Sequence, residues 1–150
     1  MSRSLKNRSK TIEAIMAGSR VATAGPVKQR LDDEWRALAE SARLARPRRE
    51  LLQVIHTSRL LDSFMASFLA HHAILYSPPP GMGNYLKALR DHSRPAVGKL
   101  PEHRRLHHQN HVVRVRNVFM HQAGVFPTQK QADELLSSMH VCLAEVAALE

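Results

Sequence analysis

The chain has 150 residues, a net charge of +9 and 43% apolar residues, few of which are aromatic. This length and apolar content suit one globular domain with a buried core, and the apolar residues, mainly Ala, Leu and Val, suit helix packing better than a β-sandwich. No apolar run reaches the length of a transmembrane helix, so no membrane-spanning helix is expected. The single cysteine, Cys142, has no partner for an internal disulfide, and we expect a cytoplasmic protein with Cys142 in its core.

The positive charge is concentrated near the N-terminus. Residues 1–30 hold seven Lys or Arg side chains against one acid, whereas residues 31–150 are only mildly basic. Residues 1–30 also show weak periodicity and are interrupted by glycines and a proline, so we predict a basic arm that is disordered or loosely helical, with one short helix near 11–17. Such an arm attracts polyanions, nucleic acid above all; a solvated tail without a partner is the alternative.

Two helices are predicted between residues 31 and 76. The first begins near Leu31, where three acidic residues favour a helix start, and ends at Pro47. The second, over 48–76, is the longest and repeats apolar residues at intervals of three and four, as the central helix of a bundle does. The run 77–83 contains three prolines and two glycines and ends this helix.

Three further helices are predicted in the second half of the chain. The pattern indicates a short helix over 84–92, a helix over 101–122, and a final amphipathic helix that begins with a capping box at Thr128. No stretch alternates with the period of a β-strand long enough to predict one. Residues 31–150 are therefore predicted to form one all-α domain, a bundle of four or five helices.

The segment 101–124 is unusually rich in His, Arg and Asn for a helix that must also pack. Four of its polar residues follow one another at helical spacing and form one ladder: Asn110, Arg114, Asn117 and His121. Arg116 and His121 are five positions apart, which is about 140° around an ideal helix. They do not stack directly, but the long arginine side chain can bridge this gap near the end of the helix.

The hexapeptide Arg-Asn-Val-Phe-Met-His at 116–121 resembles the signature of the HEPN superfamily, in which an Arg and a polar residue precede a His by a short gap. The segment 81–89 is similar to the short segment that follows the long helix in that family, and 126–128 is similar to its closing element. The resemblance spans about 48–148 and leaves the basic arm outside. It implies a HEPN-type helical bundle that pairs as a homodimer and brings two copies of the motif to a shared groove.

Many members of this superfamily are ribonucleases of toxin–antitoxin, phage-defence or RNA-processing systems. The resemblance therefore implies a metal-independent endoribonuclease that acts on RNA without a cofactor and has an antitoxin or operon partner in some systems. It assigns proton transfer to His121, stabilisation of the phosphate to Arg116, and orientation of one of these side chains to Asn117. A branch that pairs with nucleotidyltransferase antitoxins has a Tyr two residues after the His; this chain has Ala123 there and departs from that branch.

The residue types suit this chemistry on their own terms. RNA carries its own nucleophile, the 2′-hydroxyl, so its cleavage requires proton transfer and charge stabilisation but no metal. An imidazole titrates near neutrality and can transfer the proton. A guanidinium group binds phosphate oxygens in a fixed geometry. The expected products carry a 2′,3′-cyclic phosphate and a 5′-hydroxyl.

Other polar residues of the same segment are candidates for contact with RNA. They are Arg104, Arg105, His107, Asn110, His111 and Arg114. His103, His107 and His111 also have a spacing compatible with zinc, but no HExxH pattern accompanies them, so we expect no metal site. Two other functions stay open. One is a catalytically inactive HEPN domain that binds RNA, a nucleotide or a protein as a dimerisation module, and the other is a DNA-associated regulator that uses the basic arm.

Overall fold

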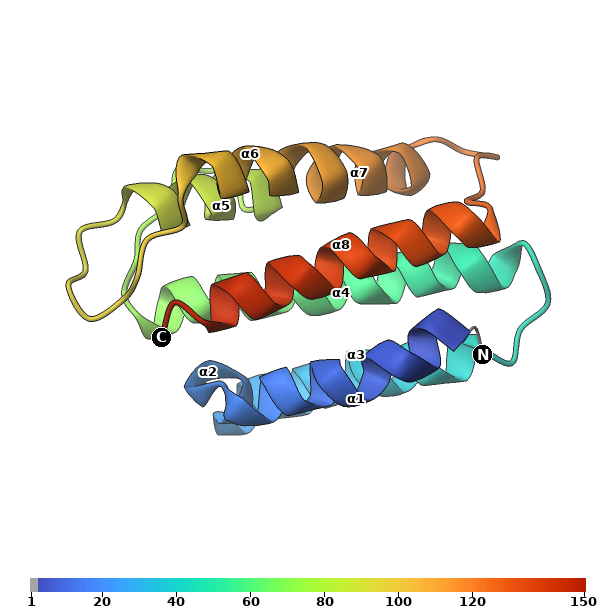
Figure 1. The fold of residues 1–150 in the computed structure, drawn as a ribbon, viewed down its shortest axis with the longest axis horizontal. Helices are drawn as coiled ribbons and strands as arrows, with labels where there is room; N and C mark the ends of the chain where they lie inside the picture. Colours follow the sequence, from blue (N-terminus) through green and yellow to red (C-terminus); the bar gives the residue numbers. More distant parts are fainter. Residues whose placement is uncertain (1–2) are drawn as a thin grey trace.

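The computed structural model describes residues 3–150, with side chains from Lys10 onward, and this part of the chain contains helices and no strand. Figure 1 shows the helices in three layers. The lower layer holds α1 (Arg3–Gly18), α2 (Arg20–Thr23) and α3 (Gly25–Ser41), and the middle layer holds α4 (Arg48–His71) and α8 (Gln129–Ala147). The upper layer holds α5 (Met82–Asp91) and a continuous rod made of α6 (Glu102–His108), η1 (Gln109–Val113) and α7 (Arg114–His121). The predicted all-α class is confirmed.

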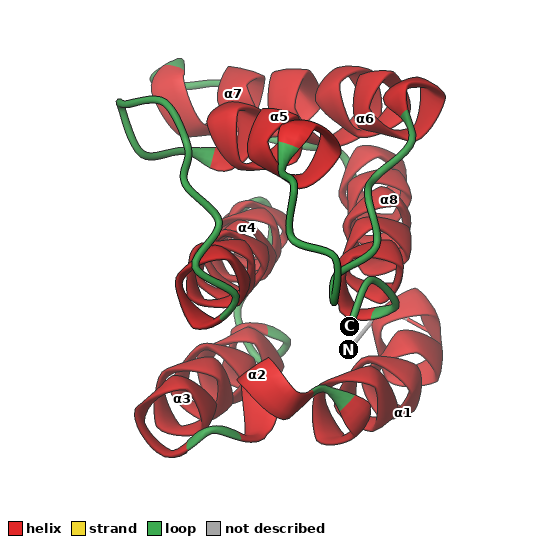
Figure 2. Ribbon diagram, turned by 90° about the vertical axis from the view of Figure 1, so that its left-hand side faces the viewer, coloured by secondary structure: helices red, strands yellow, loops and turns green. Residues whose placement is uncertain are grey.

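The end-on view in Figure 2 places α4 and α8 between the two outer layers, where the core lies. The largest buried side chains of α4 repeat at helical spacing, as the sequence predicts, and are at most 1% exposed: Phe64, Met65, Phe68 and Leu69. In the described part of the chain, no helix is both long enough and apolar enough to span a membrane.

Helix α4 ends at His71, earlier than the predicted end at 76. Ala73 adopts a left-handed conformation with φ of 51°, and the N–H of Ile74 donates a hydrogen bond to the carbonyl of Leu69. This is the Schellman arrangement, which satisfies the last carbonyls of a helix and turns the chain away from its axis. The buried Ile74 side chain packs into the core beyond the turn, so the tertiary fold decides where the helix stops.

The N-terminal segment contains more helix than its sequence predicts. The short helix predicted near 11–17 lies within the longer α1, α2 follows it, and Ile12, Met16 and Val21 are buried in the core. Ile12 and Met16 are four positions apart and lie on one face of α1, which packs against α8. This apolar face is short and the surrounding sequence is basic, so the periodicity is weak. Helices α1 and α2 lie outside residues 31–150, the part of the chain for which four or five helices are predicted.

A carboxylate joins this segment to the rest of the fold. The Glu150 side chain, only 13% exposed, accepts hydrogen bonds from the Ser19 hydroxyl (3.1 Å) and from the backbone N–H groups of Arg20 (2.8 Å) and Val21 (3.1 Å). These N–H groups lie in the first turn of α2, where backbone donors have no acceptor within the helix. The contacts tie α2 to the segment that follows α8.

The predicted helix over 101–122 is present as the rod of the upper layer, with one irregularity. Gln109–Val113 form a π-helical turn, which inserts an extra residue and changes the angle between the side chains of α6 and those of α7. Val112 and Phe119 are buried and anchor the rod on the middle layer. The polar residues of the rod are therefore distributed differently from those of an uninterrupted helix.

Candidate active site

The last turn of α7 lies beside the first half of α4. The two helices run antiparallel (Figure 1), so residues late in α7 lie beside residues early in α4. His121, the last residue of α7, is exposed and borders a cavity of about 410 Å³. Leu51 and Ile55 of α4 line the same cavity together with residues 119–126. His121 is thus accessible to a ligand at the seam between these helices.

Arg116 lies about one and a half turns earlier on α7 and is half-buried. Of its three guanidinium nitrogens, only Nε is both buried and without a hydrogen-bond partner. The acid near it is Asp62 of α4. Burial raises the pKa of Asp62, and the positive charge of Arg116 opposes this increase, so the two side chains are close enough for their charges to interact.

Of these two residues of α7, His121 lines the cavity with Leu51 and Ile55, whereas Arg116 does not line it. Asp62 and Ile55 are seven positions apart on α4, which is about two turns and places them on one face. Along α7, the five positions between Arg116 and His121 correspond to roughly 8 Å. In the described part of the chain no hydrogen bond joins Arg116, Asn117 and His121, and Asn117 is half-buried.

Asp62 also faces Tyr85 of α5, a buried core residue. Burial raises the pKa of Tyr85 to about 12, and the charge of Asp62 adds to this increase. The ring of Tyr76 packs edge-on against Tyr85, with centroids 4.8 Å apart. The sequence patterns did not single out Asp62, although an acid inside the apolar run of α4 was a usable signal. Tyr85 carried no signal that separates it from an ordinary core residue.

Two of the candidates for RNA contact are held by carboxylates. Arg104 donates two hydrogen bonds to Glu145, at 3.0 and 2.5 Å, and Arg105 donates two to Glu102, both at 2.7 Å. Bidentate pairs of this kind are strong and specific in geometry. Both guanidinium groups are therefore engaged within the protein, and a phosphate would have to compete with a carboxylate for them.

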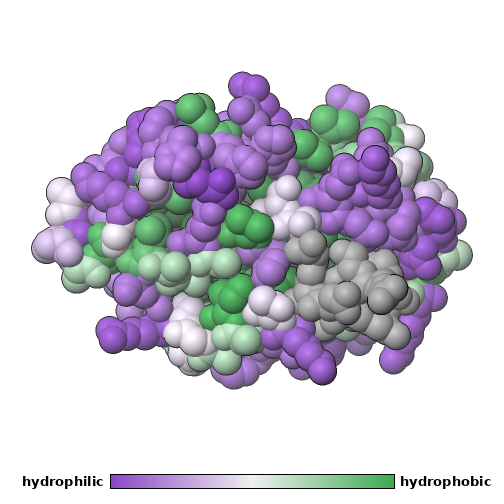
Figure 3. All heavy atoms as spheres, viewed as in Figure 1, coloured by the Kyte–Doolittle hydropathy of each residue, from purple (hydrophilic) through white to green (hydrophobic). Residues whose placement is uncertain are grey.

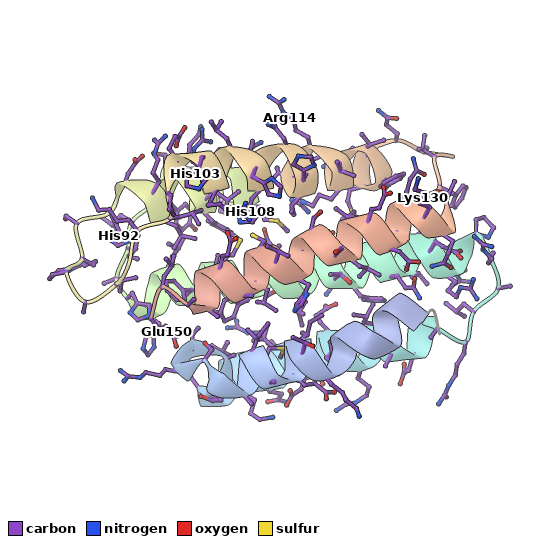
Figure 4. All side chains as sticks on the ribbon, in the orientation of Figure 1. His92, His103, His108, Arg114, Lys130 and Glu150 are labelled. Atoms are coloured by element: carbon purple, nitrogen blue, oxygen red, sulfur yellow. The ribbon has the colours of Figure 1, made fainter. Side chains whose placement is uncertain are left out.

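The other candidates lie on the outer face of the rod. Asn110, His111 and Arg114 are exposed, and Figure 4 shows Arg114 directed away from the bundle. The rings of His107 and His111 pack at a tilt of 34° with centroids 4.5 Å apart, and burial together with the charge of Arg104 lowers the pKa of His107. Among the residues that the structure describes, no group of three His, Cys, Asp or Glu side chains converges to hold a metal ion.

Beneath this face, His108 is fully buried between the rod and α8 (Figure 4). Its Nε2 lies 2.6 Å from the Glu145 carboxylate that also binds Arg104, and its Nδ1 is buried without a partner. Burial lowers the pKa of His108, and the hydrogen bond to Glu145 only partly offsets this effect. The prediction that Cys142 lies in the core is confirmed, and burial raises the pKa of its thiol to about 12.

Two exposed apolar side chains lie near the end of α7. Val118 is 40% exposed and Phe126, which lines the cavity beside His121, is 47% exposed. Figure 3 shows that the face in view is largely hydrophilic over the upper layer, with hydrophobic patches in the band below it. The surface of the chain is thus not uniformly polar, and the seam includes apolar area.

Comparisons with known proteins assign no family to the chain. None of the protein-family models matches it, and searches of curated proteins and of solved structures found no match. The interpretation of the site therefore depends on the residues and the geometry described above.

Proposed function

We propose that this chain is a HEPN-type, metal-independent endoribonuclease whose catalytic residues are Arg116, Asn117 and His121. The observation that supports it best is the accessible imidazole of His121, which borders a cavity beside α4, together with the Arg116 guanidinium on the same helix, which takes part in none of the ion pairs between described side chains. Arg104 and Arg105 differ, because each is bound by a carboxylate at two points. A guanidinium outside such a pair can bind phosphate oxygens without first breaking it.

The proposed reaction is an attack of the RNA 2′-hydroxyl on the adjacent phosphorus. His121 takes the proton of the 2′-hydroxyl as the new P–O bond forms, and Arg116 donates hydrogen bonds to the non-bridging phosphate oxygens. Asn117 orients one of these two side chains. The P–O bond to the 5′-oxygen breaks, and this oxygen takes a proton from a second imidazole. The products are a 2′,3′-cyclic phosphate and a 5′-hydroxyl.

A second copy of the chain would supply the second imidazole. The exposed apolar side chains of Val118 and Phe126, close to His121, support a homodimer with the seam at the dimer groove. The dimer would bind RNA in this groove, with Asn110, His111 and Arg114 along its approach. The settings we propose are a cytoplasmic toxin–antitoxin, phage-defence or RNA-processing system, with an antitoxin or operon partner in the first case.

The test incubates labelled mixed RNA in excess EDTA with wild type, Arg116→Ala, His121→Ala and His71→Ala. His71 is a matched control because it is also an exposed histidine at the last position of a helix. Wild type and His71→Ala should leave cyclic-phosphate ends. Loss of His121 should reduce the rate by about 10²–10⁴-fold and loss of Arg116 by about 10²–10³-fold. Circular dichroism checks that each variant folds.

The other outcomes distinguish the alternatives. Binding of RNA without cleavage by any of the four proteins would contradict the ribonuclease and favour an inactive HEPN module that binds RNA, a nucleotide or a protein. Equal cleavage by all four would indicate a contaminating nuclease or a different site, and the motif assignment would be wrong.

A further inference from the structure

The cavity beside His121 is formed where the chain turns after α7. The N–H of Val125 donates a hydrogen bond to the carbonyl of Gln122 (3.3 Å), and Gly124 between them has φ of 79°, which glycine adopts without strain. Phe126 follows this turn and lines the cavity. The volume of about 410 Å³ lies within the range of about 300–1,000 Å³ that is typical of small-molecule sites.

The walls of this cavity combine apolar and polar groups. Leu51 and Ile55 of α4 are half-buried and Phe126 is 47% exposed, so a flat apolar ligand can bury area against them. The polar groups are the amide of Gln122 and the imidazole of His121, both on exposed residues. An amide donates and accepts hydrogen bonds, so it can pair with the edge of a nucleobase.

A cation that takes part in none of the ion pairs between described side chains lies on the α4 face that borders this cavity. Arg48 is the first residue of α4, three positions before Leu51 and seven before Ile55, so the three share one face of the helix. Arg48 is exposed, whereas the neighbouring Arg49 is held by a carboxylate and by Gln129 at the start of α8 (3.3 Å). A guanidinium outside such pairs, beside an apolar cavity, is complementary to a ligand with a flat ring and an anionic group.

We infer that this cavity is a nucleotide subsite: it takes one unpaired nucleobase of the RNA, and Arg48 binds a phosphate of the same nucleotide at the rim. This inference rests on the proposed ribonuclease function. The base stacks on Phe126, which accepts any nucleobase, whereas Gln122 pairs with the base edge and determines the base preference. His121 borders the cavity, so the base that enters it belongs to a nucleotide next to the scissile bond.

The first test measures binding by methyl NMR, which requires no cleavage. The chain has four isoleucines, and Ile55 is the one that lines the cavity. The others, Ile12, Ile15 and Ile74, are internal controls, and their unchanged signals show that a variant folds. The Ile55 signal, assigned with Ile55→Val, should shift on addition of a nucleoside 3′,5′-bisphosphate because of the ring current of the base, but not on addition of inorganic phosphate. Phe126→Ala should weaken this binding on the order of tenfold.

Two further variants separate the roles of the phosphate and the base. Arg48→Ala should weaken binding of the bisphosphates on the order of tenfold and leave binding of unphosphorylated nucleosides unchanged. The control Arg20→Ala removes an exposed arginine of α2, at the other end of the bundle from the start of α4 (Figure 1), and should change neither. In RNA cleavage, the product ends of wild type should show a base preference next to the cut, and Gln122→Leu should reduce it on the order of tenfold.

The outcomes separate this inference from the function on which it rests. An Ile55 signal that no bisphosphate shifts, or that shifts equally in Phe126→Ala, would overturn the subsite and leave the ribonuclease intact. An unchanged base preference in Gln122→Leu would overturn the role of Gln122. A shift that depends on Phe126, in a wild type that cleaves no RNA, would support the nucleotide site and overturn the ribonuclease. An Ile55 signal that moves with protein concentration and not with nucleotide would assign the cavity to a second copy of the chain and overturn the subsite.

Discussion

Replacement of Glu145 by alanine should destabilise the fold through His108. The Glu145 carboxylate joins the rod to α8: it accepts two hydrogen bonds from Arg104 and lies 2.6 Å from Nε2 of His108. The His108 side chain is 0% exposed and its Nδ1 has no partner. The substitution would therefore leave both ring nitrogens buried and unpaired.

The size of the effect follows from these contacts. A buried polar atom that loses its partner costs about 1–3 kcal/mol. The Arg104 side chain is 28% exposed, so water can replace the carboxylate there and the lost pair adds at most about 1 kcal/mol. We expect the free energy of unfolding to fall by about 2–3 kcal/mol. For a chain of this length, that lowers Tm by roughly 4–12 °C.

Urea denaturation followed by circular dichroism measures this change. The control Glu134→Ala alters an acid on the same helix that is 66% exposed and 3.8 Å from Lys130, and it should change stability by less than about 0.5 kcal/mol. A double-mutant cycle of Glu145→Ala with His108→Ala should give a coupling of about 1 kcal/mol or more. If Glu145→Ala behaves like Glu134→Ala, or the coupling is zero, His108 does not depend on Glu145 and the reasoning is refuted.

Three further predictions concern pH, Glu150 and the cysteine. Burial lowers the pKa of His108 below its ordinary 6.5, so the unfolded state binds more protons than the folded state below that pH. The midpoint of urea denaturation should therefore be lower at about pH 5 than at about pH 7.5. An equal drop in the midpoint of His108→Gln would contradict this reasoning. Glu150→Ala should cost about 1–2 kcal/mol and speed hydrogen exchange at the Val21 amide, and unchanged exchange would show that the carboxylate does not hold α2. The Cys142 thiol is 1% exposed and its pKa is raised to about 12 by burial, so a disulfide reagent should react with it only in urea; fast reaction of the folded protein would contradict the burial.

Helix α4 contributes to both the core and the candidate site. One of its faces supplies Phe64 and Phe68 to the core, and another supplies Leu51 and Ile55 to the cavity beside His121. Small shifts of α4 would therefore change the wall of the cavity beside His121. Substitutions in the core beneath α4 are expected to affect the site as well as stability.

Local spacing in the sequence was sufficient to predict the helical class and the positions of the main helices. Apolar residues at intervals of three and four predicted α4, and its buried face is confirmed. The capping box at Thr128 is also confirmed, since its side chain accepts from the Gln131 N–H and the Gln131 side chain accepts from the Thr128 N–H. These features depend on residues within one or two turns of each other, so the sequence determines them.

Only the tertiary structure decided which side chains meet across helices. Arg104 and Glu145 are 41 residues apart, and their pairing engages a cation that the sequence alone presents as available for RNA. The charge of Arg116 likewise acts on Asp62 only because α7 packs beside α4, and Ile12 becomes a core residue only because α1 packs on α8. Helical periodicity identifies the apolar face of each helix, but it contains no information on the neighbour, the direction or the register of packing. Those depend on the burial and pairing of groups over the whole chain, which no local pattern records.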